Sequence, residues 1–376
     1  MADTSVKIEV DGVEIEESGV LQLDDVQVEE SAREADAASV TARLVPSDGG
    51  EWTSLLDALA APRTPLAITV SRGLEEYRFD GRSTEVEWRF EPDGASRFVA
   101  KAVDRTIDMN VEEKVVDWSG NTDSQIAESI LSSNGFATAV ESTPDTADPD
   151  VHVVIQRATD WAFLRSLAAK WGYEVYLESR RGQTTGVFGP LDPTADSQAD
   201  LPLGYGDPMA PVSVRARLLA GREVHGSRMA LLSDEVIDGE DGGTGESQGT
   251  RPFGGESIAL ITPDEVDGEI DPAEAAKGMA RRSAFGLRLD VEVDTDRLDT
   301  LLRARRTVKV AGLPSLLSGL WLVESTRHVI TPDGHRQRLA LARNAYGSGM
   351  GALASAGAAL AGSAAEALFA GGSGVS

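Results

Sequence analysis

The chain has four histidines, and their spacing decides whether the sequence carries a metal site or an acid–base site. They are His152, His225, His328 and His335. A helical zinc site needs two histidines four residues apart, and a nucleophile elbow places a serine between glycines. None of the four fits either arrangement. His328 and His335 fall on facing arms of an expected hairpin, where two ligands without a third favour cross-strand packing over a zinc site.

Two other segments have only part of a ligand-binding pattern. The run Asp290–Asp296 has the acidic spacing of a calcium loop, but Thr295 stands where the turn glycine is needed and Leu301 where the bidentate glutamate is needed. A strand with one acidic face is the better interpretation. The glycines of 242–245 are not followed by Lys-Ser or Lys-Thr, so they do not form a phosphate loop.

The composition removes further kinds of chemistry. The chain has no cysteine, which excludes thiolate metal sites and cysteine nucleophiles. Its 62 acidic residues make chance carboxylate pairs so common that none indicates a glycosidase. We therefore assign no catalytic, cofactor-binding or metal-binding residue, and we expect no enzyme and no cofactor.

The charge balance is the most unusual global property of the sequence. Acidic residues outnumber the 35 basic ones and give a formal net charge of −27. A surface this acidic repels nucleic acid and anionic lipid. Two explanations are compatible with it: adaptation to the host, through salt or a GC-rich genome, and an acidic channel wall that does not retain passing DNA or cargo.

Residues 1–111 predict a β-barrel or sandwich. Apolar and polar side chains alternate over 40–44, 84–90 and 98–102, which is typical of strands with one buried face. Residues 66–70 begin another strand. One helix is expected between them, because apolar residues follow helical spacing over 52–59 until Pro62 ends the pattern.

Residues 112–202 predict a small α/β insert. Thr122 and Gln125 form a capping-box pattern for a first helix, and Thr159 caps a second helix that Gly172 ends. Short strands are expected at 151–155 and 173–177. We expect a self-contained satellite domain on the outside of any assembly, whose second helix buries Phe163, Leu167 and Trp171.

Residues 203–346 return to a β pattern and predict a second barrel. A helix begins at Asp271-Pro272 and ends near Arg281-Arg282. Strands are expected at 212–218, 229–232, 306–311, 320–330 and 336–343. The glycine-rich acidic stretch 234–255 predicts a mobile loop. The low-complexity Ala/Gly-rich tail 347–376 is too weakly apolar for stable membrane insertion and predicts a linker or a helix that orders on a partner.

Two local patterns carry a resemblance to a known family. In Gln156–Ala168 an Asp160-Trp161 pair precedes Phe163-Leu164, and Gly172-Tyr173 follows the helix. The second pattern comprises Val308–Gly312, Ser318–Val323, His328, Gly334 and Arg343-Asn344. In their order along the chain, these patterns resemble the phage late control D family. That family includes baseplate hub proteins of contractile tails and the hub module of type VI secretion spike proteins.

The resemblance implies a mainly β fold with two tail-tube-like β-barrel domains, 1–111 and 203–346, plus the small α/β domain. It implies a structural baseplate hub protein of a phage-like tail or contractile injection system. Three copies would form a ring that connects the hexameric tail tube to the trimeric central spike and leaves a central channel. Both a virus and a phage-derived injection system fit, with a contractile or a non-contractile tail.

The partners implied by the resemblance are two further copies of the chain, the tail tube protein, a separate trimeric spike protein and other baseplate components. No specific nucleic-acid binding is expected. The N-terminus lacks a secretory pattern, so we expect assembly in the host cytoplasm, followed by residence in the tail or baseplate of the particle. Two alternatives stay open: a tandem β-domain adhesion or receptor-binding component of the same particle, and a tail-associated cell-wall hydrolase.

Overall fold

The protein is built mainly from strands, with a few short helices. The computed structural model describes residues 4–15, 21–45, 58, 61–91, 96–143, 154–180, 182–199, 202–206, 208–229, 236–241, 246–253, 258–261, 272–298 and 300–347. The helical elements in these ranges are α2 Asp123–Ser133, α3 Asp160–Trp171, α4 Pro272–Ser283 and the short 3-10 helices η1 Arg105–Met109 and η2 Thr295–Arg297. The strands before the insert are β1 Thr4–Val10, β2 Val13–Glu14, β3 Leu21–Ser31, β4 Ala37–Leu44, β5 Pro65–Arg72, β6 Glu75–Arg89 and β7 Ser96–Asp104.

Strands after β7 form the insert and the second barrel-like region. Those of the insert are β8 Glu113–Asp117, β9 Ala137–Val140, β10 Ile155–Thr159, β11 Glu174–Arg180 and β12 Gln183–Gly189. Those that follow are β13 Leu203–Gly204, β14 Met209–Ala216, β15 Glu223–Met229, β16 Val236–Asp241, β17 Arg251–Pro252, β18 Ile258–Ile261, β19 Leu287–Asp294, β20 Thr307–Ala311, β21 Gly319–Thr331, β22 Gly334–Arg343 and β23 Ala345–Tyr346.

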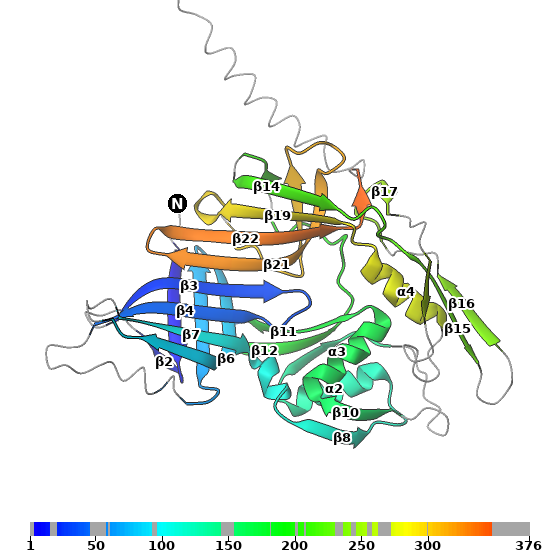
Figure 1. The fold of residues 1–376 in the computed structure, drawn as a ribbon, viewed down its shortest axis with the longest axis horizontal. Helices are drawn as coiled ribbons and strands as arrows, with labels where there is room; N and C mark the ends of the chain where they lie inside the picture. The colour runs from blue at the N-terminus through cyan, green and yellow to red at the C-terminus, as the bar shows by residue number, and fades with distance from the viewer. Residues whose placement is uncertain are drawn as a thin grey trace, which may run out of the picture.

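One 13-stranded sheet contains strands from both barrel-like regions. Its path runs β14-β19-β22-β21-β3-β4-β7-β6-β5-β1-β2, with β20 and β13 attached beside β21. The two regions meet where β3 pairs with β21, from Val26↔Ile330 to Ser31↔Ser325. Figure 1 shows β14, β19, β22, β21, β3, β4 and β7 stacked in this order. The two regions are therefore continuous through a shared sheet, and the boundaries at 111 and 203 stay a prediction.

The strands from β14 to β6 bury one face and leave the other open. Alternation is regular in β7, where Phe98, Ala100 and Ala102 are buried between more exposed neighbours. In β22 the buried residues His335, Gln337 and Leu339 alternate with exposed Arg336 and Arg338. A period of two is what a half-buried antiparallel strand requires. The strand predictions for 40–44, 84–90, 98–102, 306–311, 320–330 and 336–343 are confirmed.

Three apolar cores lie beneath and beside the sheet. The core of the first region gathers β1 and β3 to β7, and it includes Leu301 from the second region. The core of the second region centres on Trp321 and the apolar residues of β19 to β22. The third core belongs to the insert and surrounds α2 and α3. Each core is a cluster of buried aliphatic and aromatic side chains, which is the main stabilising term in folding.

The two helices of the insert begin and end where the sequence predicts. The Thr122 side chain accepts a hydrogen bond from the Gln125 backbone N–H, and the Gln125 side chain accepts one from the Thr122 backbone N–H, which completes a capping box. Thr159 caps α3, and Gly172 ends it with a φ of 65°. Trp171 and Leu167 are buried as predicted, whereas Phe163 is only partly buried. The strand predicted at 151–155 is displaced: β10 runs from Ile155 to Thr159 and shares only Ile155 with the prediction, Val154 is not in a strand, and 151–153 lie outside the described residues.

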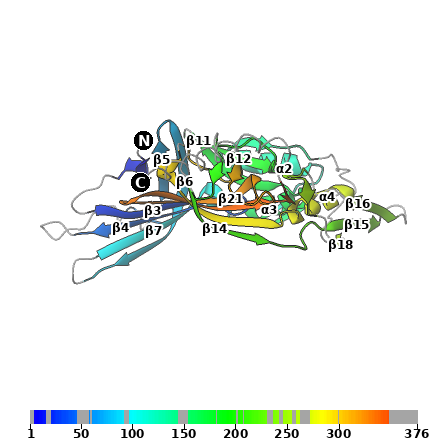
Figure 2. The same cartoon turned by 90° about the horizontal axis from the view of Figure 1, so that it is seen from above.

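The insert is not self-contained, which corrects the sequence prediction. Its core includes Val224 of β15 and Ala276 and Ala280 of α4, so the second region supplies part of it. α4 lies against α3 so closely that a Cβ at Gly278 would fall 2.7 Å from the Gly172 nitrogen. Figures 1 and 2 place α3, α4, β15 and β16 together at one end of the molecule. The start and end signals of α4 located this helix in the sequence without identifying what it contacts.

The stretch predicted as a mobile loop over 234–255 contains strands, so that prediction is wrong for the described part. β16 pairs with β15, and β17 pairs with β23. The acidic, glycine-rich composition concealed this because strands that add to an existing sheet obtain their hydrogen bonds from it. The strand expected at 229–232 shares only Met229 with β15, which runs from Glu223, and 230–232 lie outside the described residues. The strand expected at 212–218 ends at Ala216, and Leu218 is 76% exposed.

Other sequence predictions lie outside the described residues. These are most of the helix over 52–59, the Asp271 cap of α4 and nearly all of the tail 347–376. The helix that begins at Pro272 and the one-sided acidic strand over 290–294 are confirmed as α4 and β19.

Replacing Gly278 with alanine tests the α3–α4 contact. An alanine in a helix interior normally gains about 0.5–1 kcal/mol over glycine. Here the new Cβ would meet the backbone of Trp171 and Gly172 at 2.7 Å, so we expect Gly278→Ala to lower the free energy of unfolding by about 1–3 kcal/mol. Urea denaturation measures this. Arg281→Ala, on an exposed position of the same helix, should change stability by no more than about 0.5 kcal/mol, and a stabilised Gly278→Ala would show that α4 packs elsewhere.

Candidate functional site

The two histidines expected on a hairpin do meet. β21 and β22 pair across the turn, and His328 Nδ1 lies 3.0 Å from His335 Nε2. Tyr77 stacks on His328 with ring centroids 5.3 Å apart. Burial, the neighbouring His335 and Arg303 hold the pKa of His328 well below its usual range. The neutral imidazole therefore serves as a cross-strand packing partner here, in line with the sequence interpretation.

Most of the acidic run over 290–296 is likewise a structural strand, since β19 ends at Asp294 and η2 begins at Thr295. Asp290 and Glu292 lie on the open face of β19, where Asp290 pairs with Arg215 at 3.0 Å and Glu292 with Arg336 at 3.0 Å. His152 lies outside the described residues, and His225 pairs with Glu223 at 3.0 Å. In the described ranges, no three His, Cys, Asp or Glu side chains group as metal ligands would.

The main polar feature that sequence reasoning missed is a buried charge cluster where the three cores meet. Glu30, at the end of β3, is 1% exposed. Arg303 binds it through two hydrogen bonds, Nη2 to Oε1 at 2.6 Å and Nε to Oε2 at 2.8 Å. Arg305, with a φ of 67°, reaches Asp36 Oδ1 at 2.5 Å and the Ser31 carbonyl at 2.6 Å. Such a forked geometry is the strongest form of ion pair between side chains.

Aromatic rings complete the cluster from two other elements. Arg303 lies 4.3 Å above the ring of Tyr77 in β6, and Arg305 lies 4.3 Å above the ring of Tyr176 in β11. The segment before β20 thus touches the first region through Tyr77 and the insert through Tyr176. Arg303 and Glu30 are 273 positions apart, so no local pattern in the sequence signals that they meet.

The cluster contains one more acidic than basic group. Asp104 lies beside Asp36, which donates its backbone N–H to Asp104 Oδ2 at 3.1 Å. Three carboxylates, of Glu30, Asp36 and Asp104, therefore face two guanidinium groups. Burial raises the pKa of Asp36 to about 7, and the charges of Asp104 and Glu30 add to the increase while Arg305 opposes it. Burial also raises the pKa of Asp104. A shared proton relieves the surplus negative charge.

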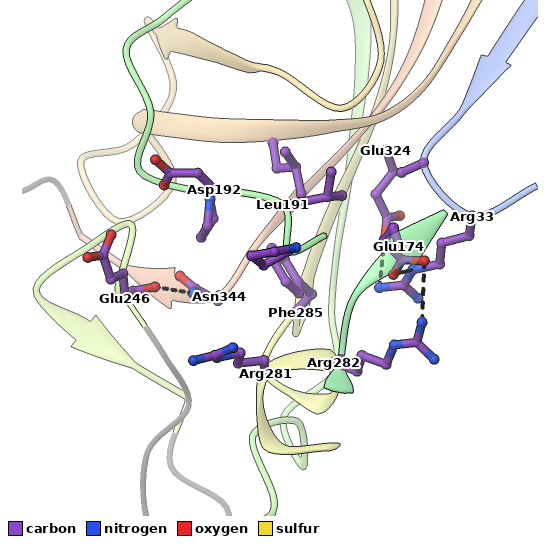
Figure 3. A pocket seen from close by; sticks show the side chains of 15 residues that line it. Arg33, Glu174, Leu191, Asp192, Glu246, Arg281, Arg282, Phe285, Glu324 and Asn344 are labelled. Atoms are coloured by element: carbon purple, nitrogen blue, oxygen red, sulfur yellow. Dashed lines mark hydrogen bonds and ion pairs between the residues drawn. The ribbon is translucent and has the colours of Figure 1, made fainter. Parts of the chain in front are cut away.

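A cavity of about 550 Å³ opens at the same junction (Figure 3). Arg33 from the β3–β4 turn and Arg282 from α4 converge on Glu174 at 3.6 Å and 3.3 Å. Leu191 and Phe285 supply apolar lining. Burial raises the pKa of Glu174 although both arginines oppose the increase. Arg33 and Arg282 are both engaged by Glu174, so these two arginines act as structural cross-links in the wall of the cavity.

The Arg343-Asn344 pair fixes the segment that follows β16. Arg343 is fully buried and donates to the carbonyls of Ser318, Leu317 and Gln248 at 2.9, 3.2 and 3.0 Å. Burial lowers its pKa to about 10, so it stays charged at neutral pH. Asn344 accepts from the Gln248 backbone at 2.9 Å and donates to the Glu246 carbonyl at 2.7 Å. The motif thus acts as a tie between backbone segments.

The large sheet has a stretch whose two outer edges are partly free of strand partners. From β14 to β6 it runs through eight strands, and every neighbouring pair is antiparallel. β14 pairs only with β19 among the described residues. β6 pairs with β5 through its first half, up to Arg82, and with β7 through its second half. Beyond Met209 in β14, and over 84–89 in β6, the outer edges therefore carry backbone groups without a strand partner in the described chain.

The described helices are all short. None of them has both the length and the apolar character that crossing a bilayer requires.

Comparison with known sequences identifies one family. A family model described as the Alg8 N-terminal domain matches residues 2–226, which is more than half of the chain. No curated protein sequence gives a match.

Comparison with solved structures shows the fold. The tail protein from Neisseria meningitidis MC58 aligns with a TM-score of 0.62 and 14% identity, over 91% of this chain and 97% of that one. The 43 kDa tail protein of prophage MuSo2 from Shewanella oneidensis aligns with a TM-score of 0.60 and 15% identity, over 90% and 98%. The E. coli c3393 protein, a type VI secretion component, aligns with a TM-score of 0.52 and 12% identity, over 91% and 78%. The mainly β fold with its α/β insert is thus the fold of these tail proteins.

The raised pKa of Asp36 predicts a specific pH dependence. The folded protein holds a proton on Asp36 up to about pH 7, whereas an unfolded aspartate loses it near 3.8. The folded state therefore binds more protons between these values, and this contribution to stability is lost as pH rises through 7. We expect the free energy of unfolding of Asp36→Asn, relative to that of the wild type, to increase as pH rises from 5 to 8.

Urea denaturation of both proteins at pH 5, 6, 7 and 8 measures the difference. Asp117→Asn is the control, because Asp117 is exposed and its pKa is lowered by Ser119. A difference between wild type and Asp36→Asn that is constant over this range would show that Asp36 is ionised throughout.

Proposed function

The chain belongs to the family described as the Alg8 N-terminal domain, and from its tail-protein fold we propose that it is a structural hub subunit of a phage-like tail or contractile injection system. In this role three copies form a ring that joins the hexameric tail tube to the trimeric spike. The particle is assembled in the host cytoplasm, and the ring contacts the tube protein, a separate spike protein and other baseplate components.

The observation that carries this proposal is the eight-stranded sheet with two unpaired edges. An even number of alternating strands leaves β14 and β6 running in opposite directions. When β14 of one copy meets the 84–89 edge of β6 in the next copy, the new pair is antiparallel like all the others. A head-to-tail contact of this kind closes into a ring when the rotation between copies allows it.

The dimensions of such a ring are compatible with a channel. Three copies of eight strands spaced about 4.8 Å apart give a backbone circumference of about 115 Å and a diameter of about 37 Å, before strand tilt widens it. Side chains of the open face point inward and narrow this bore. The apolar cores and the insert lie on the other side of the sheet and face outward.

The proposed role has no chemical step. It requires a rigid sheet, complementary edges and a passage. The buried charge cluster and the Arg343-Asn344 tie serve this role by holding the cores against one another.

Ring formation is tested by proline substitution at the free edge of β14. Of the adjacent residues Ser213 and Val214, one directs its N–H toward β19 and the other directs it outward. Proline on the outward position removes an edge donor without breaking the β14–β19 ladder. We expect that variant to stay folded by circular dichroism and to fall from trimer to monomer in mass photometry at micromolar concentration with the spike protein present.

The second edge supplies a matched test. Proline at Glu87 or Trp88 of β6 should have the same effect, because the ring needs both edges. A wild-type protein that stays monomeric or dimeric with the spike bound would count against the hub proposal. So would edge variants that keep the wild-type mass.

The absence of a catalytic step is tested separately. Purified protein run on a zymogram gel that contains bacterial cell wall should give no clearing at pH 5 to 8, with lysozyme as the positive control. A cleared band at 39.8 kDa that survives repurification would favour the cell-wall hydrolase alternative.

A further inference from the structure

The open face of the eight-stranded sheet is charge-balanced, unlike the chain as a whole. Leaving aside the part of β6 that pairs with β5, cross-strand register and ion pairing place nine basic and nine acidic side chains of the described residues on it. The basic residues are Arg43, Arg89, Arg97, Lys101, Arg215, Arg288, Arg327, Arg336 and Arg338. The acidic residues are Asp24, Asp25, Glu29, Glu85, Glu87, Asp290, Glu292, Asp294 and Glu324. The net charge of these described residues is therefore zero in a chain of net charge −27.

Every one of the nine basic groups has an acidic partner on the same face. The pairs on the first region include Arg43–Asp24 at 3.2 Å and Lys101–Glu85 at 2.8 Å. On the second region Arg338 reaches Glu292 at 3.1 Å. The remaining pairs are Arg89–Glu87, Arg97–Asp24, Arg215–Asp290, Arg288–Glu324, Arg327–Glu29 and Arg336–Glu292. Pairing within the face leaves none of these cations without a local countercharge.

Not every row across the strands is balanced by itself: Arg43, Arg97 and Arg89 share one row, and their countercharges, Asp24 and Glu87, come from neighbouring positions. A balanced row of residues in register reads Glu292, Arg338, Arg327 and Glu29. Another joins Lys101 of β7 to Glu85 of β6. Charges of opposite sign this close cancel at distances beyond a few ångströms, because their fields overlap and salt screens what remains. A polymer that slides over this face therefore meets no sustained potential of either sign.

We propose that the open face is a low-adhesion passage surface, matched to a moving polymer of either charge sign, and that the acidic surplus of the chain is kept off it. This inference rests on the proposed hub, in which the open face lines the channel. It replaces the expectation of an acidic channel wall, since the acidic excess resides elsewhere on the molecule. A uniformly acidic wall would repel a polyanion and retain a basic protein, whereas an ion-paired wall does neither.

Removing negative charges from the open face tests the proposal. The open-face variant combines Glu29→Gln, Glu85→Gln, Glu87→Gln and Glu292→Gln, which leaves nine basic against five acidic groups there. The probe is a fluorescent 30-base-pair DNA duplex in about 50 mM salt, where phosphate contacts are strongest. We expect no measurable DNA binding by the wild type. The open-face variant should bind at least tenfold more tightly than the wild-type limit and lose this binding as salt rises.

The matched control changes net charge equally but elsewhere. Glu112, Glu113, Glu128 and Glu141 are exposed residues of the insert, and their joint replacement by glutamine should not produce DNA binding. Binding by the wild type, or equal binding by both variants, would overturn the proposal. The face is exposed in a single copy as well, so the result does not depend on ring formation. Mass photometry on the same samples separates failure of this inference from failure of the hub.

Discussion

The antiparallel pairing of β3 with β21 is the interaction on which the rest of the structure depends. Its ladder from Val26↔Ile330 to Ser31↔Ser325 joins segments 300 residues apart into one sheet. On the buried side of the same strand pair, His328 stacks on Tyr77 and Glu30 receives Arg303. On the open side, Arg327 pairs with Glu29. A one-residue slip of β3 in this register would exchange its two sides and place Glu30 on the open face, away from Arg303.

The buried charge cluster holds the insert to this sheet and sets how stability responds to pH. Breaking such a cluster by removing one partner is costly, because it leaves an uncompensated buried charge. Two buried groups have opposite effects on how the free energy of unfolding changes with pH. The raised pKa of Asp36 favours the folded state at low pH, whereas the lowered pKa of His328 disfavours it once pH falls below about 6.5, where an unfolded histidine gains a proton. Their opposition flattens the net dependence, so the stability of the junction changes less with pH than either group alone would dictate.

Sequence reasoning succeeded where structure is determined locally. Residues three to ten positions apart determine the helix caps at Thr122, Thr159 and Gly172 and the alternating strands. The structure contains these features as predicted. Sequence reasoning failed where a distant element supplies the partner. β16 and β17 have the composition of a loop and become ordered by pairing with β15 and β23. The charge cluster was missed for the same reason, because Glu30 and Arg305 carry no local mark of burial. The helix α4 was placed correctly, but its contact with Gly172 follows only from the tertiary fold.

An open sheet face bounded by two unpaired edges is normally a liability. Exposed edge strands recruit other strands, and proteins usually protect them with charges, bulges or covering elements. Here the charged residues of the face form ion pairs with one another, so they do little to prevent strand pairing at the edges. The bulges between Ser83 and Glu85 and between Met209 and Val212 lie at the two outermost strands, where they twist each edge and restrict which partner fits. Edges that are complementary in direction and each shaped by a bulge select a second copy of the same sheet over an arbitrary strand. With an odd number of strands between them, the same edges would meet in parallel, and the antiparallel ladder could not continue around a ring.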